Sequence, residues 1–149
     1  MKVVVQRVKR ASVRVGDVLI SEIDRGLCLL VGISTKDNLD SIKQMARQVV
    51  KLRLFSNDEQ KRWQYGIKDD TSLAILAISQ FTLLARTDKG SKPDFHCAMP
   101  GSEAQTLFDS FVDELGLLLG EDGRVKKGAF GEYMQVEIVN DGPVTIVLE

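Results

Sequence analysis

Residues 26–32, Gly26-Leu-Cys-Leu-Leu-Val-Gly32, are the stretch of the sequence that most clearly indicates the fold. Every residue between the two glycines is apolar. Because the side chains of a strand alternate between its two faces, an uninterrupted apolar run is typical of a strand that is covered on both faces. We therefore predict that residues 27–31 form a central strand with a packed layer on each side.

The residues before this strand predict a β-hairpin. Valines occupy alternating positions at both ends of residues 2–15, at positions 3, 5, 13 and 15. Gly16-Asp17 then provides a turn signal before the apolar run Val18–Ile23. The first three strands are therefore expected to follow one another with short connections.

Two amphipathic helices are predicted further along the chain. Apolar residues recur at helical spacing from Leu39 to Leu52, and either Asp37 or Asn38 is available as the N-cap. A second helix is expected behind Ser102 and Gln105, which have the spacing of a capping box. The apolar face of this second helix consists of Leu107, Phe108, Phe111, Val112, Leu115 and Leu118.

A second central strand and a terminal hairpin complete the predicted fold. A long apolar run with a polar island covers residues 72–84, after an interrupted polar segment at residues 56–70. Residues 133–139 and 144–148 flank the turn signal Asn140-Asp141-Gly142-Pro143. The element order βββ-α-β-α-ββ predicts an α+β fold, with a large, mainly antiparallel sheet and two packed helices.

Composition limits the classes to which the protein can belong. With 149 residues, of which 44% are hydrophobic, the chain fits one globular domain over residues 1–149. A chain of this size buries about 70% of its unfolded surface, which excludes disorder and fibre. The chain has 20 Lys and Arg residues and 21 Asp and Glu residues, so it is not basic throughout. Any contact with RNA must therefore be local.

The cysteines and the apolar runs indicate a cytoplasmic protein. Cys28 and Cys97 form no CxxC pair, so neither a disulfide framework nor a zinc site is indicated. The N-terminal apolar run breaks at Gln6 and Arg7, too early for the core of a signal peptide. No apolar stretch approaches the roughly 20 residues that a bilayer requires, so we expect no membrane association.

The familiar catalytic and cofactor motifs are absent from the sequence. His96 is the only histidine and Cys97 follows it, but neighbouring side chains in an extended chain point to opposite faces. We therefore interpret them as a loop histidine beside a small buried thiol and predict no metal site. Neither GxGxxG nor GxxxxGK[ST] occurs, so no cofactor is expected.

Positive charge gathers at two places in the sequence. Either group can bind phosphate or simply face solvent, and the acidic residues elsewhere slightly favour the second interpretation. The residues are Lys2, Arg7, Lys9, Arg10 and Arg14 near the start, and Arg86, Lys89 and Lys92 after the apolar run.

Two segments break the pattern of a plain core. Ser79-Gln80-Phe81-Thr82 places three hydrogen-bonding side chains at the end of an apolar strand, where each unpartnered buried group would cost about 1 to 3 kcal/mol. These are either satisfied polar residues at a strand end or catalytic groups. Asn140-Asp141-Gly142-Pro143 is a turn signal followed by a proline that removes a ladder N–H.

These two segments carry a resemblance to a known family. Ser79-Gln-Phe-Thr-Leu83 and Asn140-Asp-Gly-Pro-Val-Thr145 resemble the two signature motifs of the D-aminoacyl-tRNA deacylases. Lys92-Pro-Asp-Phe-His-Cys-Ala-Met-Pro100 is similar to a loop of the eukaryotic members. The resemblance extends over the whole chain, through residues 4–8, 10–13, 89–90, 130–131 and 134–136.

The resemblance implies an enzyme and a site. The family's members are homodimers that hydrolyse the ester joining a D-amino acid to the 3′ end of tRNA, with active sites at the subunit interface and a barrel-like sheet. By this resemblance Ser79, Gln80, Phe81 and Thr82 form the floor of the pocket. Backbone N–H groups near Phe81 would then hold the ester carbonyl as an oxyanion hole.

The remaining site residues are also implied by the resemblance. A cis Gly142-Pro143 bond would enter the pocket from the partner subunit, braced by Arg7, while Phe130 and Met134 line the pocket. Two backbone carbonyls would hold the substrate's α-amino group and leave no room for an L side chain, so glycine mischarged on tRNA is an expected substrate. No base accompanies Thr82, so backbone groups and the RNA's 2′-hydroxyl are expected to act instead of a nucleophile.

A different class of protein remains as the alternative. The basic N-terminal strand would suit a small RNA-binding or dimerisation domain without turnover. The paired aromatic residues that RNA-binding sheets use are missing from the expected strands, which weakens this alternative.

Overall fold

The computed structural model describes residues 1–57, 59, 61–121 and 123–149. Its elements follow the predicted order up to the second long helix, with one short 3-10 helix added after the fourth strand; the last two strands differ, because residues 125–127 form a strand that was not predicted and the two predicted terminal strands are one. They are β1 (Lys2–Val15), β2 (Val18–Ile23), β3 (Gly26–Gly32), α1 (Leu39–Lys51), β4 (Ala74–Ser79), η1 (Phe81–Leu84), α2 (Gly101–Leu119), β5 (Val125–Lys127) and β6 (Gln135–Leu148). None of the helices in this described part of the chain is long and apolar enough to cross a membrane.

The sheet is mixed and mainly antiparallel. Its strand order is β2-β1-β3-β4-β5, and β6 pairs with β1 beside this path. The three pairs that involve β1 are antiparallel, whereas β3–β4 and β4–β5 are parallel, because α1 and α2 cross over between those strands. The predicted α+β class with two packed helices is confirmed.

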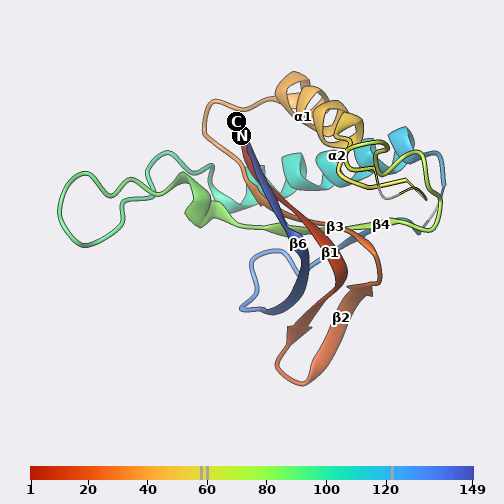
Figure 1. Cartoon of the computed structure of the whole chain (residues 1–149). Coiled ribbons are helices and arrows are strands. Elements are labelled where there is room, and N and C mark those ends of the chain that lie inside the picture. Colours follow the sequence, from red (N-terminus) through yellow and green to blue (C-terminus); the bar gives the residue numbers. More distant parts are fainter. Residues whose placement is uncertain (58, 60, 122) are drawn as a thin grey trace.

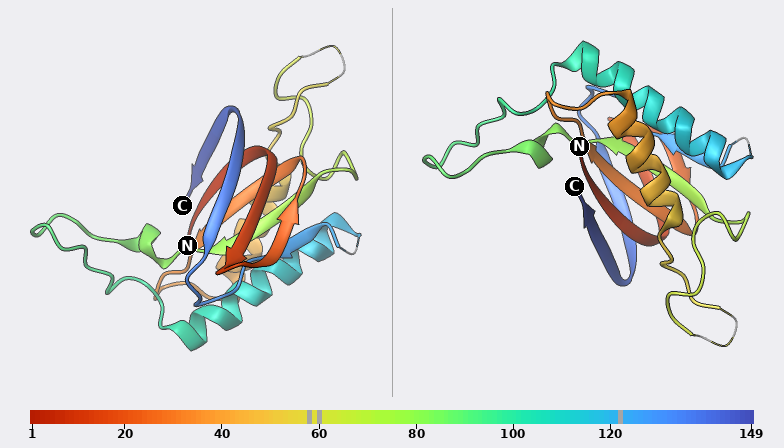
Figure 2. Two further views of the ribbon diagram at one scale, coloured as in Figure 1. Left: turned by 90° about the horizontal axis from the view of Figure 1, so that it is seen from below. Right: turned by 90° about the horizontal axis from the view of Figure 1, so that it is seen from above.

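The two long strands fold the sheet over on itself. The first half of β1 pairs with β3 and its second half pairs with β2, while β6 accompanies both halves. Figure 1 and the left view of Figure 2 show β1 and β6 bending together, which makes the sheet nearly barrel-shaped. The bend creates an interior on one face, while α1 and α2 cover the other face.

The central strand β3 is buried on both faces, as its apolar run predicts. Leu27 and Leu29 pack into the core beneath the helices, and Cys28 packs into the interior of the folded sheet. All three side chains have no solvent exposure. Burial of this kind contributes roughly 1.5 to 3 kcal/mol for each large apolar side chain, which is why β3 fixes the position of both layers.

The predicted terminal hairpin is wrong. Residues 133–139 and 144–148 do not pair with each other; the ladder of β6 runs along β1 on both sides of the turn signal. Gln6 pairs with Thr145 and Val8 with Asn140, so two steps along β1 correspond to five steps along β6. Because β1 supplies a partner of 14 residues, the turn signal is accommodated as a bulge within one long strand.

Two predicted boundaries also change. The helix α2 begins at Gly101 with Pro100 at its N-cap, so Ser102 lies inside the helix and its side chain caps nothing. The apolar run of residues 72–84 is a strand only from Ala74 to Ser79 and then turns into η1. The cap of α1 is Asn38, one of the two predicted candidates, and it forms a capping box with Ser41.

A buried arginine that the sequence did not single out fixes the start of β5. The Arg124 side chain donates from Nε to the Leu73 carbonyl at 3.0 Å and from Nη2 to the carbonyls of Ile67 and Asp70. These bonds tie the loop before β4 to the strand on its other side.

We expect Arg124→Met to lower the free energy of unfolding by about 3 kcal/mol or more, because it leaves buried carbonyls without a donor. Urea unfolding followed by circular dichroism measures this loss. Arg47→Met on the exposed face of α1 is the matched control and should change the value by less than about 0.5 kcal/mol. Equal stabilities of the two variants would contradict this role of Arg124.

Candidate active site

The end of β4 presents two unpaired backbone donors. The Gln80 N–H donates to the Val31 carbonyl at 2.7 Å, and the chain then turns into η1. The N–H groups of Phe81 and Thr82 find no acceptor among the residues that the structure describes, and the Gln80 side chain does not cap them. Two adjacent donors are therefore free to bind an oxygen atom.

The side chains of this segment are oriented by each other and by the neighbouring loop. The Gln80 amide donates to the Thr82 hydroxyl. Phe81 is 56% exposed and meets Phe95 edge to face, with ring centroids 5.0 Å apart. The side chains of Gln80 and Thr82 are thus hydrogen-bonded to each other.

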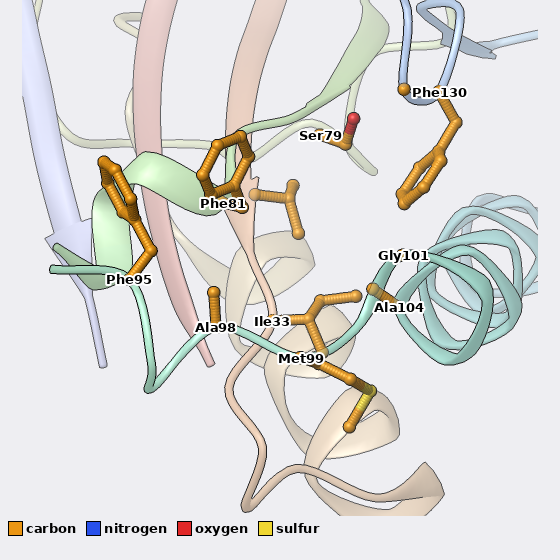
Figure 3. Close-up of a pocket in the computed structure, with 11 residues that line it drawn as sticks. Ile33, Ser79, Phe81, Phe95, Ala98, Met99, Gly101, Ala104 and Phe130 are labelled. Carbon is orange, nitrogen blue, oxygen red and sulfur yellow. The ribbon is translucent and has the colours of Figure 1, made fainter.

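A cavity of about 360 Å³ opens beside these donors. Figure 3 shows Phe81 and Phe130 on opposite sides of it, with Ser79 between them. Among the described residues that line it, Ser79 alone has a hydrogen-bonding side chain, and none is titratable. The lining consists of Val31, Ile33, Ser79, Phe81, Phe95, Ala98, Met99, Gly101, Ala104, Phe130 and Gly131.

This lining suits an apolar or aromatic group held against backbone donors. Because no nucleophile and base meet in the lining, the arrangement offers polarisation of a carbonyl by N–H groups instead of side-chain attack. The structure thus brings together three of the predicted site residues, Ser79, Phe81 and Phe130, with Gln80 and Thr82 adjacent.

The second signature segment, residues 140–145, is not part of this lining. Gly142 and Pro143 are exposed, and neither is among the described residues that line the cavity. The peptide bond between them is cis, as the resemblance predicts.

Arg7 holds this segment in place, and the predicted contact is present. Its Nε donates to the Asp141 carbonyl at 3.1 Å and lies 3.5 Å from the Asp141 carboxylate. Its Nη1 donates to the Leu54 carbonyl at 2.6 Å. On the other side of the bulge, the Asn140 amide donates to the carbonyls of Arg7 and Val144. The bulge is therefore fastened at both ends while its tip stays open to solvent.

Met134 lies outside the cavity lining. It packs against the interior of the folded sheet, beside Gly128. Its predicted part in the substrate pocket therefore stays a prediction, whereas Phe130 is in place.

The expectation for His96 and Cys97 is wrong in its geometry. They lie in a turn, and His96 Nε2 is 3.3 Å from the Cys97 sulfur. His96 Nδ1 in turn lies 2.6 Å from Asp94 Oδ2. The pKa of the Asp94 carboxyl is lowered, first by the backbone N–H of His96 and then by its side chain. In the described part of the chain, no group of three or more potential ligands could hold a metal ion.

Part of the cavity wall carried no signal in the residue pattern. Phe95, Ala98 and Met99 reach the cavity from the segment before α2, and Gly101 and Ala104 reach it from the first turn of that helix. Small residues in a helix turn that packs against a sheet are common, so only the resemblance of residues 92–100 pointed to this region.

The chain is similar to known proteins over its whole length. The family model described as D-Tyr-tRNA(Tyr) deacylase matches residues 4–149. A D-aminoacyl-tRNA deacylase of Drosophila melanogaster is 51% identical, over 100% of this chain and 92% of that protein. D-aminoacyl-tRNA deacylase 1 of Homo sapiens is 48% identical, over 100% of this chain and 70% of that protein.

Solved structures have the same fold. A structure titled c-Myc DNA Unwinding Element Binding Protein matches with a TM-score of 0.93 and 48% identity, over 100% of this chain and 98% of that one. A probable eukaryotic D-amino acid tRNA deacylase matches with a TM-score of 0.87, over 99% and 97% of the two chains. Because its sequence is only 16% identical to this chain, the match shows a shared fold and nothing more.

Gly142→Ala should disturb the bulge. Gly142 has φ +134°, and an added Cβ would lie 2.8 Å from Val144 Cγ2 and 3.2 Å from Arg7 Nη2. We expect a loss of about 1 to 3 kcal/mol in the free energy of unfolding, measured by urea denaturation. Gly116→Ala, where the added Cβ meets open space within α2, should instead be neutral or stabilising. A Gly142→Ala protein as stable as this control would show that the bulge tolerates a side chain.

Proposed function

Because the chain belongs to the D-aminoacyl-tRNA deacylase family, we propose that it hydrolyses the carboxylic ester that joins a D-amino acid to the 3′ end of tRNA. Glycine mischarged on tRNA is a further substrate, and L-aminoacyl-tRNA is rejected. The observation that carries this proposal is the pair of free N–H groups at Phe81 and Thr82 beside an apolar cavity. We place the reaction in the cytoplasm, where charged tRNA is used.

The backbone of residues 81 and 82 acts as the oxyanion hole. In ester hydrolysis negative charge develops on the carbonyl oxygen, and preorganised donors stabilise that charge more than they stabilise the ground state. The Thr82 hydroxyl already accepts from Gln80, and no base adjoins it among the described residues. Water is therefore the attacking group, and the 2′-hydroxyl of the terminal ribose supports its attack.

The complete site is formed by two copies of the chain. The cavity lining is apolar apart from Ser79, so it offers no acceptor side chain that would bind a charged α-amino group strongly. Gly142 and Pro143 are exposed, and neither is among the described residues that line the cavity of their own chain. In a homodimer this segment enters the cavity of the other subunit, and its carbonyls accept from the substrate's amino group.

Selection against L-amino acids follows from that contact. When the amino group is held by backbone carbonyls and the ester carbonyl by backbone N–H groups, only one direction remains open for a side chain at Cα. A D side chain extends along this direction past Phe130, which lines the cavity. Backbone contacts make the selection independent of the identity of the amino acid, and glycine has no side chain to be excluded.

A binding domain without turnover is not favoured. Such a domain would have no need of an apolar cavity that ends at free backbone donors, whereas ester hydrolysis uses both features.

The test of this function compares the two enantiomers of one substrate. Incubation with D-Tyr-tRNA should release tyrosine, while L-Tyr-tRNA should be cleaved at least about 100-fold more slowly, a ratio that steric selection in a pocket can supply. Gly-tRNA should also be cleaved. Equal rates for both enantiomers would overturn the chiral selection, and binding of the tRNA without release of tyrosine would favour the alternative domain.

The identity of the catalytic groups is tested by single-turnover rates. Loss of an oxyanion donor typically costs about 10²- to 10³-fold. Thr82→Ala keeps its backbone N–H and should lose much less than this, whereas D-Tyr-tRNA with a 2′-deoxy terminal ribose should lose at least as much. A collapse of the Thr82→Ala rate with the deoxy substrate still cleaved would establish a side-chain nucleophile.

A further inference from the structure

A cluster of reactive side chains lies on the segment that leads from η1 to α2. We call residues 85–98 the arm; Figure 1 shows it projecting from the body of the molecule in green. Arg86 and Asp94 pair across the arm through two backbone hydrogen bonds of 2.8 and 2.9 Å. This pairing brings the turn with His96 and Cys97 back to the cavity. Deacylation by backbone donors makes no use of these side chains.

Asp94, His96 and Cys97 form a chain of contacts. The Asp94 carboxylate accepts from the His96 backbone N–H at 2.9 Å and lies 2.6 Å from the ring nitrogen Nδ1. The other ring nitrogen, Nε2, lies 3.3 Å from the Cys97 sulfur. A carboxylate that orients an imidazole beside a thiol is the arrangement that withdraws the thiol proton and leaves a nucleophilic thiolate.

Arg86 adds a positive charge to this cluster. Its Nε lies 3.5 Å from the Asp88 carboxylate, and the pKa of the guanidinium is raised, chiefly by Asp88 and next by the neighbouring Cys97. Lys89 and Lys92 add positive charge to the exposed arm, which with Arg86, Asp88 and Asp94 has three cations and two carboxylates.

Cys28, the other cysteine, has the environment of an unreactive thiol. Cys28 has no solvent exposure, and burial raises the pKa of its thiol to about 12. Cys97 is partly exposed and lies between Phe95 and Ala98, both of which line the cavity. A large group attached to Cys97 would therefore lie close to the residues that line the cavity.

We propose that Cys97 is a reversible modification site that exchanges with small anionic disulfides, and that the resulting adduct closes the entrance of the cavity. The Cys97 thiolate attacks one sulfur of the disulfide, a new S–S bond forms, and the original S–S bond breaks. The leaving thiolate takes up the proton held by His96. Cys97 is oxidised and the departing thiol is reduced, so no further reactant is needed. The cations of the arm favour disulfides that carry carboxylates.

Oxidised glutathione is the probe that tests this site. Intact-mass measurement should show one glutathione adduct per chain, located by peptide mapping at Cys97 and absent in Cys97→Ser. Neutral hydroxyethyl disulfide should react more slowly, and added salt should reduce this difference. Adduct formation at Cys28, or equal formation in Cys97→Ser, would overturn the proposal.

Substitutions of His96 and Asp94 test whether Cys97 reacts because these neighbours activate it or only because it is exposed. His96→Ala should form the adduct about tenfold more slowly, and free imidazole should restore the rate. Asp94→Ala should also slow the reaction, with Asp94→Asn restoring part of the rate because it keeps a hydrogen-bonding group beside the ring. Unchanged rates in His96→Ala would show that Cys97 reacts without its neighbours.

The effect on the cavity rests on the proposed deacylase function and is measured separately. The glutathione adduct should lower the rate on D-Tyr-tRNA by about tenfold or more, since a misplacement of 1 Å can cost about 10²-fold, and dithiothreitol should restore the rate. Unmodified Cys97→Ser should keep the wild-type rate and resist glutathione. An adduct that leaves the rate unchanged would overturn closure of the cavity, whereas an unmodified protein without deacylase activity would contradict the function but not the thiol site.

Discussion

The constraint on which the rest of the structure depends is the pairing of β1 with β6 over nearly the whole length of both strands. The strand β1 changes its second partner from β3 to β2 midway, and β6 follows it through the bend. The bend creates two cores from one sheet, and β3 is buried between them. It also requires extra residues on β6, and these are the residues of the second signature segment.

The bend and the cavity therefore form at different places in the same sheet. Arg7 lies at the bend, where β1 passes from one register to the next, and its guanidinium fastens the bulge. The cavity forms instead where the parallel strands β3 and β4 end together, with Val31 paired to Ser79. The first turn of α2 closes it with two small residues, Gly101 and Ala104. The cavity and the bulge thus form at different places in the same chain, and the proposed dimer would bring the cavity of one chain to the bulge of the other.

Local sequence patterns predicted the type of an element more reliably than they predicted which strand it pairs with. The apolar run of β3 predicts a strand and the helical spacing of α1 predicts a helix, whatever each of them packs against. Asn140-Asp141-Gly142-Pro143 has the composition of a hairpin turn, but the length of β1 decides that it becomes a bulge. His96 and Cys97 face each other because they lie in a turn that the Ala98 N–H closes by donating to the Phe95 carbonyl, which no pattern around the histidine indicates. The candidate site was predicted from the resemblance of two motifs to a known family, since a sequence pattern does not show which backbone N–H groups are free.

The central claim is that the cavity of one chain is completed by the bulge of another. A mixed dimer purified through two different tags tests it, with Gly142→Ala in one chain and Ala98→Trp, which fills the cavity, in the other. Each homodimeric variant should be inactive on D-Tyr-tRNA. The mixed dimer contains one intact bulge and one intact cavity that face each other, so it should recover about half of the wild-type rate per dimer. A mixed dimer as inactive as its parents, or a wild-type protein that stays monomeric under assay conditions, would contradict the shared site.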